Sequence, residues 1–257
     1  KFHKSPGREI SPKWLPFPQG LCIVVANSRK ARELSGKERK NYALPRFAYS
    51  VTLAILKTIL RRLLEGRMMS SDPDIKALSL SPALIDSIST LSDITPQKFG
   101  STRVIYKLLL LIPARVSLAE LHTDWPEIGS LLVEAEDKFI KSLPPDSIPA
   151  SLDLRGAFMF GISECARSAE FRKLLEAKGA TDPLQVAATV DGLGRLMNIG
   201  HRGDSPEQGQ IVSDKYLSGL IDSLDAGCES DRPEAALCNQ TGDFRGSTPE
   251  LDTLQAL

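Results

Sequence analysis

The side chains best suited to catalysis or metal binding are scattered along this sequence. The three histidines, His3, His122 and His201, are far apart, and none has a metal-ligand spacing with another. The four cysteines form no C-x-x-C pair, so the sequence indicates neither a zinc knuckle nor a redox pair. The sequence contains no G-x-S-x-G, Walker A or G-x-G-x-x-G motif. Isolated residues therefore assign no reaction.

Composition narrows the class of protein without naming an activity. The chain has 257 residues, of which 42% are hydrophobic and 25% charged, as is ordinary for a soluble globular protein. Its 32 basic and 32 acidic residues balance, so we expect neither a nucleic-acid partner nor a membrane partner. Basic residues predominate over 29–67 and acidic residues over 204–252. The basic stretch could attract phosphates, or both stretches could be solvated faces. Unpaired cysteines in apolar segments predict a cytoplasmic location.

The elements that must position any site are mostly helical. Apolar periodicity predicts helices over 47–64, 83–91, 103–112, 126–139, 154–175, 183–197 and 214–224, and another beginning at Ser247. Ser81-Pro82 is a predicted N-cap, and Ser117-x-x-Glu120 is a predicted capping box. The run from Leu21 to Ala26 predicts one strand buried on both faces. The fold class is therefore α+β, dominated by helix.

The prolines and composition suggest three consecutive parts. Residues 1–69 form a strand, a loop and a long helix. Residues 70–145 form short helices punctuated by proline, as expected of a helical insertion or cap. Residues 146–257 form a second helical part.

Three collinear segments resemble galactokinases of the GHMP kinase superfamily. The first is the strand end Asn27-Ser28, followed by Tyr42. The second is 194–201, Gly-Arg-Leu-Met-Asn-Ile-Gly-His, which is similar to Gly-x-Leu-Met-x-x-Ser-His. The third is 247–252, Ser-Thr-Pro-Glu-Leu-Asp, which matches Ser-x-Pro-Glu-Leu-Asp. The resemblance implies a helix-rich, carboxy-terminal GHMP-kinase-like domain with a small sheet, truncated at both ends.

The same resemblance supplies candidate site residues. It implies that Tyr42 and Arg46 border the sugar, because a tyrosine at a pocket rim offers ring surface and a hydroxyl. In the structural alternative, Tyr42 packs at a helix entrance. Glu164 and Arg167 match a Glu-x-x-Arg pair whose role in the family is architectural. Met197 and His201 share a helix face, and His201 suits a structural position at a helix end.

The implied activity is transfer of the γ-phosphoryl group of ATP to the anomeric hydroxyl of a sugar, with Mg²⁺. The phosphate-binding Ser-Ser-Ala loop of the family does not occur in these residues, and the catalytic Asp is expected upstream of Lys1. The third glycine-rich motif is expected after Leu257. We therefore expect the parent protein to bind ATP, Mg²⁺ and sugar, and this fragment alone to hold none of them tightly.

Other functions remain open on the sequence. The sugar could be galactose, arabinose, a uronic acid or a heptose. The protein could instead be a degenerate galactokinase homologue that acts as a sugar sensor or protein-binding module. A third possibility is a helical interaction module whose matches arise by chance.

Overall fold

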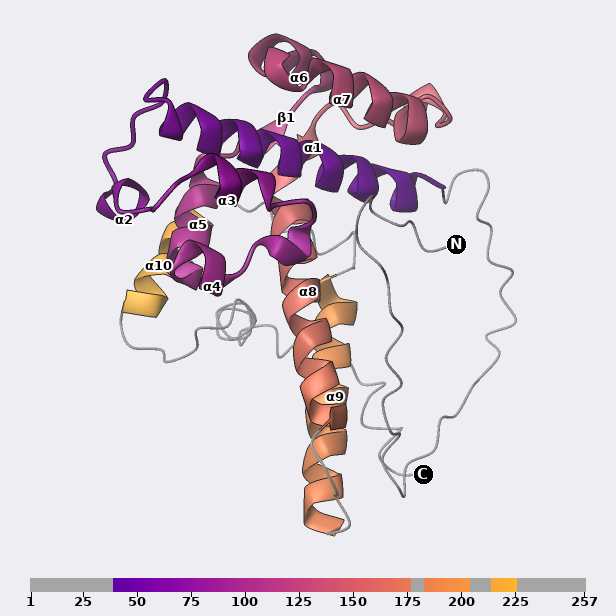
Figure 1. Cartoon of the computed structure of the whole chain (residues 1–257). Coiled ribbons are helices and arrows are strands. Elements are labelled where there is room, and N and C mark those ends of the chain that lie inside the picture. The colour runs from indigo at the N-terminus through magenta and orange to yellow at the C-terminus, as the bar shows by residue number, and fades with distance from the viewer. Residues whose placement is uncertain (1–38, 177–182, 204–213, 226–257) are drawn as a thin grey trace.

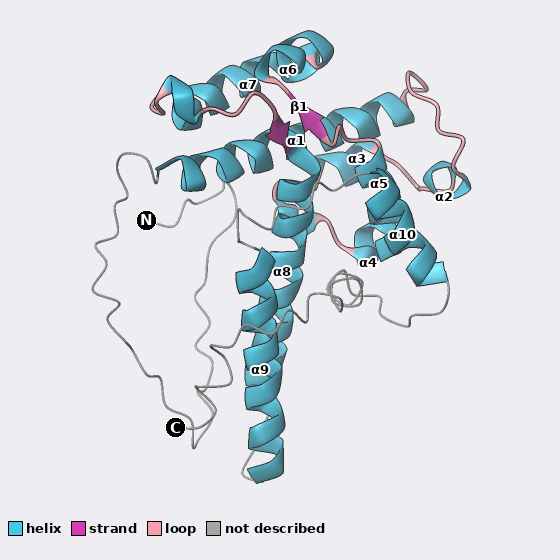
Figure 2. Ribbon diagram, turned by 180° about the vertical axis from the view of Figure 1, so that it is seen from behind, coloured by secondary structure: helices cyan, strands magenta, loops and turns pink. Residues whose placement is uncertain are grey.

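The structure, a computed structural model, describes residues 39–176, 183–203 and 214–225, and these form a helix-rich α+β fold (Figures 1 and 2). Its α-helices are α1 (Arg39–Leu64), α2 (Pro73–Lys76), α3 (Pro82–Asp86), α4 (Pro96–Phe99), α5 (Thr102–Leu110), α6 (Leu118–Asp124), α7 (Gly129–Ala135), α8 (Leu154–Glu176), α9 (Pro183–Gly203) and α10 (Asp214–Asp225). Shorter helical turns are η2 (Leu91–Asp93), η3 (Pro126–Ile128), η4 (Glu136–Ile140) and η5 (Pro145–Ser147), and η4 has π-helical hydrogen bonding.

The described sheet consists of two short antiparallel strands, β1 (Arg115–Val116) and β2 (Leu152–Asp153). Arg115 lies opposite Asp153, and Val116 lies opposite Leu152. The sequence analysis did not predict this pair, because two residues are too few to show the alternation of a strand. The predicted strand over 21–26 lies outside the described residues.

Helix α1 forms the centre of the protein. Its buried residues recur around most of the circumference, so neighbours cover it on several sides. The predicted start at Phe47 is wrong, because the helix begins at Arg39 and includes Pro45. The fixed backbone angle of proline suits a helix, and Pro45 lies near the amino-terminal end, where few hydrogen bonds are lost.

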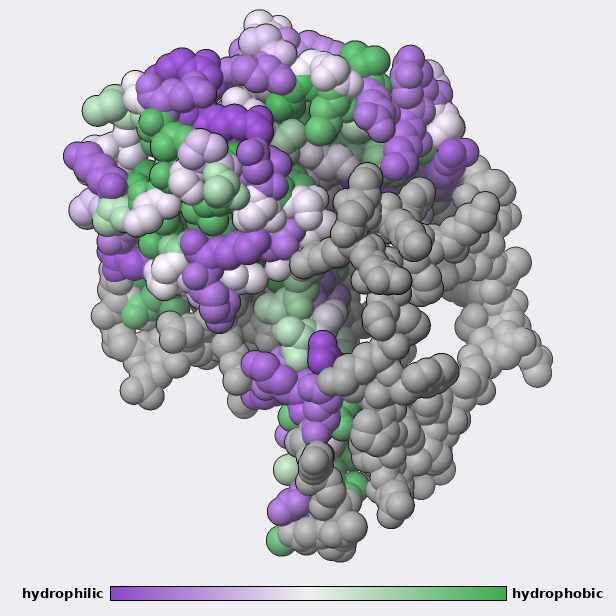
Figure 3. Space-filling model, viewed as in Figure 1, coloured by the Kyte–Doolittle hydropathy of each residue, from purple (hydrophilic) through white to green (hydrophobic). Residues whose placement is uncertain are grey.

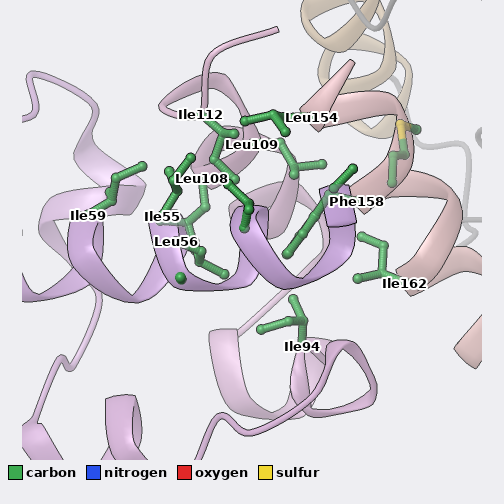
Figure 4. Close-up of a cluster of buried hydrophobic side chains, with 14 of the residues drawn as sticks. Ile55, Leu56, Ile59, Ile94, Leu108, Leu109, Ile112, Leu154, Phe158 and Ile162 are labelled. Atoms are coloured by element: carbon green, nitrogen blue, oxygen red, sulfur yellow. The ribbon is translucent and has the colours of Figure 1, made fainter. Parts of the chain in front are cut away.

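A single hydrophobic cluster joins α1 to α5 and α8 (Figure 4). Ile55 and Ile59 of α1 face Leu108 of α5, while Phe158 and Ile162 of α8 close the other side of the cluster. Residues from all three parts of the sequence, 1–69, 70–145 and 146–257, contribute to this cluster. Burial of these side chains is the main favourable term in folding.

Polar residues before proline start several of the short helices. Ser81 accepts a hydrogen bond from the backbone N–H of Leu84 at 3.1 Å, which confirms the predicted N-cap. Helix α3 nevertheless ends at Asp86 rather than at the predicted residue 91. Lysine side chains bind the carbonyls beyond its end: Lys57 Nζ donates to Ile88 O at 2.9 Å. Cations are favourable partners for carbonyls that a helix end leaves unpaired.

The predicted capping box at Ser117 and Glu120 is confirmed. The backbone N–H of Glu120 donates to Ser117 Oγ at 3.2 Å, and the backbone N–H of Ser117 donates to Glu120 Oε2 at 2.7 Å. Pro126 opens a helical segment as predicted, although this segment is divided into η3, α7 and η4. Helices α5, α8 and α10 lie within two residues of their predicted bounds, whereas α9 begins at Pro183 as predicted and ends at Gly203, six residues beyond the predicted end.

Helices α8 and α9 lie side by side and project from the rest of the described structure (Figures 1 and 2). The first half of α8 belongs to the hydrophobic cluster, and its second half packs against α9. We call the second half of α8 together with α9 the arm.

Candidate functional site

Tyr42 and Arg46 lie together on the first turns of α1. They are four residues apart, and the Arg46 guanidinium carbon is 4.0 Å from the centre of the Tyr42 ring. Both side chains are exposed. The helix predicted over 47–64 left both residues outside it, and that boundary is wrong because α1 begins at Arg39. Helical geometry is what brings them together, since residues four apart share a face.

This stacked pair can bind a polar ligand. A guanidinium over the face of an aromatic ring can still offer N–H donors to a ligand, and the phenol hydroxyl can donate or accept a further hydrogen bond. Arg39 and Lys40 precede the pair, and the first turn of α1 has no acidic residue. These basic side chains therefore lie at the amino-terminal end of α1, which is also the positive end of the helix dipole.

Two arginines near the carboxy-terminal end of α1 have acidic partners. Arg61 binds Asp86 at 3.3 Å, and Arg62 binds Glu127 through two hydrogen bonds of 2.9 and 2.7 Å. Arg62 also lies over the ring of Trp125, with 4.8 Å between the guanidinium carbon and the ring centre. These contacts assign Arg61 and Arg62 to helix packing, and Arg46 remains the better candidate for a ligand.

The Glu164–Arg167 ion pair forms on α8, as predicted. Arg167 Nε donates to Glu164 Oε1 at 2.7 Å, and the Arg167 side chain is buried. The ring of Phe160 lies 5.7 Å from its guanidinium carbon. Both residues belong to α8, so the pair links one turn of that helix to the next, and the architectural role that the family resemblance implies for it stays a prediction.

The second family-like segment lies in α9. Leu196 is buried against α8, whereas Met197 is 65% exposed. His201 belongs to α9, but its side chain lies outside the described part of the chain, as do residues 21–28 and 247–252. The structure thus brings the matched residues of α8 and α9 onto adjacent helices.

Sequence reasoning missed a buried arginine on α8. The side chain of Arg155 is 4% exposed and donates from Nε to Ile112 O at 2.6 Å and from Nη2 to Leu110 O at 2.9 Å. Its Nη1 donates to Asp214 Oδ1 at 2.5 Å. Arg155 therefore joins the carboxy-terminal end of α5 to the amino-terminal end of α10. No local pattern could reveal it, since its partners are 43 to 59 residues away.

A cluster of charges between α2 and α5 was also missed. Lys107 Nζ lies 2.8 Å from Asp72 Oδ2 and 2.5 Å from Asp74 Oδ2, and Arg103 Nε lies 2.8 Å from Asp74 Oδ2. Burial opposes the charge on Lys107, but hydrogen bonds to the two carboxylates raise its pKa above the usual value. The pKa of Asp74 is lowered mainly by its hydrogen bond to Lys107. The Asp72-Pro73 pair, an N-cap before proline, was the available sequence signal.

The described residues contain no group of three His, Cys, Asp or Glu side chains that could hold a metal ion. We assign no phosphoryl-transfer step to them. Among the same residues, α1 is the one helix long and apolar enough to cross a membrane, and more than half of its apolar stretch is buried inside the protein.

Comparison with known proteins gives no relative for this chain. No protein-family model, no curated protein and no solved structure matches it. Function must therefore be argued from the residues themselves.

Proposed function

We propose that this chain is part of an ATP-dependent sugar 1-kinase that phosphorylates galactose or a related sugar. Within such an enzyme it would be the helix-rich, carboxy-terminal part of a GHMP-kinase-like domain. The supporting observation is the order of three family-like segments, Asn27-Ser28 with Tyr42, 194–201 and 247–252, along one chain. The exposure of Tyr42 and its stacking with Arg46 are compatible with a role at the rim of a sugar site.

In this proposal the pair binds the sugar and takes no part in proton or phosphoryl transfer. The Tyr42 ring offers apolar surface to the C–H face of a sugar, and its hydroxyl can donate or accept a hydrogen bond. The Arg46 guanidinium offers several N–H donors to hydroxyl or phosphate oxygens. Both groups would act on substrate affinity rather than on the chemical step.

The test uses the full-length protein encoded by the gene. Transfer of phosphate from ATP is measured with galactose, arabinose, a uronic acid and a heptose as acceptors, and sugar binding is measured by calorimetry without ATP. We expect ATP-dependent phosphorylation of at least one of these sugars. Binding without turnover would favour a sugar sensor, and absence of both would exclude the kinase and the sensor together.

Two exposed arginines on α1 provide a matched pair of variants for the site. Arg46→Ala should raise the KM for the sugar about tenfold, equivalent to about 1.4 kcal/mol, with little change in kcat. Arg61→Ala removes an exposed arginine paired with Asp86 and should leave both constants within about twofold. Equal effects of the two variants would remove Arg46 from the sugar site.

A further inference from the structure

Helix α9 carries two apolar seams at coiled-coil spacing. The first consists of Val186, Thr189, Leu193 and Leu196, which are separated by three, four and three residues and are partly or fully buried. This seam faces α8, which is the main neighbour of α9 in the described part of the chain. A Cβ atom on Gly192 would lie 3.1 Å from Leu174 Cδ1, so the two helices approach closely here. Repeated spacings of three and four are typical of helices that pack along their length.

The second seam follows the same spacing one residue later and is exposed. It consists of Ala187, Val190, Gly194 and Met197, all of which are exposed. Val190 is 44% exposed and Met197 65%, while a Cβ atom on Gly194 would meet no other atom within 4 Å. Apolar residues are visible along the projecting arm in Figure 3, between hydrophilic ones. A helix with two adjacent seams is typical of a bundle with more than two helices.

The charges beside the exposed seam indicate which partner fits it. Asp191 and Arg195 are both exposed and share one flank of the seam, four residues apart. If two copies of α9 pack antiparallel about a two-fold axis near residue 193, Asp191 of each copy faces Arg195 of the other. The same alignment places Val190 between Gly194 and Met197 of the second copy, and the glycine, which has no side chain, leaves room for it. The surface is therefore complementary to itself in charge and in size.

We propose that the exposed seam of α9 binds a second copy of this chain, with the two α9 helices antiparallel. The two arms then form a four-helix arrangement in which both seams of each α9 are covered. The contact is isologous, since the same patch serves on both chains. It does not depend on the sugar-kinase proposal, because no residue of the seam is assigned to substrate.

The test measures the mass of the chain by light scattering and sedimentation over about 1 to 200 μM, a range that spans micromolar dimer affinities. The unaltered chain should be a dimer at the upper concentrations. Val190→Lys should weaken the dimer at least about tenfold, because it places an ammonium group in the apolar seam. Val133→Lys is the matched control, since Val133 of α7 is 49% exposed but lies outside the seam, and it should leave the dimer intact.

A charge-exchange series tests the antiparallel alignment. Asp191→Arg and Arg195→Asp should each weaken the dimer at least about fivefold, and the double variant should return to within about twofold of the original affinity. Failure of the double variant to recover would overturn the alignment. A chain that is monomeric throughout the concentration range would overturn the proposal. The seam would then be covered by another segment of the chain or by a different protein. A dimer insensitive to Val190→Lys would also overturn it.

Discussion

Replacement of Arg155 by methionine should destabilise the protein by about 3 kcal/mol, because it leaves one buried and one part-buried carbonyl oxygen without a donor. Methionine has a similar length and fills part of the same space. It cannot donate to Ile112 O or Leu110 O, which now accept bonds of 2.6 and 2.9 Å. These carbonyls terminate α5, where the helix dipole also favours a cation.

The expected loss of unfolding free energy is the balance of unfavourable and favourable effects of removing the guanidinium. An acceptor left unpaired costs about 1–3 kcal/mol, with the part-buried Leu110 O at the lower end, so the two carbonyls cost about 2–4 kcal/mol together. Removal of the guanidinium also removes its own cost of burial, which offsets part of this loss. The Asp214 contact adds little, because the Asp214 side chain is 78% exposed and water replaces the arginine. A net loss of about 3 kcal/mol corresponds to a fall in Tm of about 6–12 °C for a chain of this size.

The assay is urea unfolding followed by circular dichroism, with two control variants. Arg61→Met makes the same chemical change at an exposed ion pair with Asp86 and should cost less than about 1 kcal/mol. Asp214→Asn removes the carboxylate alone and should cost a similarly small amount, about 1 kcal/mol or less. The reasoning is refuted if Arg155→Met differs from Arg61→Met by less than about 1 kcal/mol. It also fails if Asp214→Asn is as destabilising as Arg155→Met.

Two other charged groups lead to predictions about pH. Burial opposes the ionisation of Asp93, but hydrogen bonds from the backbone and hydroxyl groups of Ser89 and Thr90 dominate and hold its pKa well below the usual 3.8. The ionised form therefore stabilises the fold above about pH 4 and loses this contribution as the pH falls further, so Asp93→Asn should reduce the difference in unfolding free energy between pH 7 and pH 3. An unchanged pH dependence in this variant would contradict the assignment. The pH dependence for Lys107 has the opposite direction, because its pKa is raised in the folded protein. Its contribution to stability is present below pH 10.5, its unperturbed pKa, and is lost as the pH rises through the pKa of the folded state. Lys107→Met should destabilise the protein by about 1–2 kcal/mol and expose α2 to proteolysis first, whereas uniform protection of α2 would argue against the lysine as its anchor.

Much of the local structure is determined by the sequence. Ser81-Pro82 and Ser117-x-x-Glu120 specify helix starts because the required donors and acceptors lie within three residues of each other. The long apolar runs of α5 and α8 specify helices because their period is visible within one element. For the same reason, the sequence predicts the Glu164–Arg167 pair.

Tertiary structure decided the features that depend on distant partners. Arg155 becomes a connector between α5 and α10 only when segments 43 to 59 residues apart meet around it. The hydrogen bond from Lys57 to Ile88 O, just beyond the end of α3, forms only because α1 packs beside it. The two-residue strands exist because each pairs with the other, and neither has a pattern of its own.

The candidate site also depends partly on the sequence and partly on the tertiary structure. The sequence supplies the residue types of Tyr42 and Arg46, and the family resemblance suggests sugar as their ligand. Their stacking and exposure follow from the extension of α1 back to Arg39, which the sequence analysis did not predict. The physical reason is that a helix boundary depends on packing as well as on local propensity. Pro45, the seventh residue of α1, is therefore helical because the turns that follow it are buried.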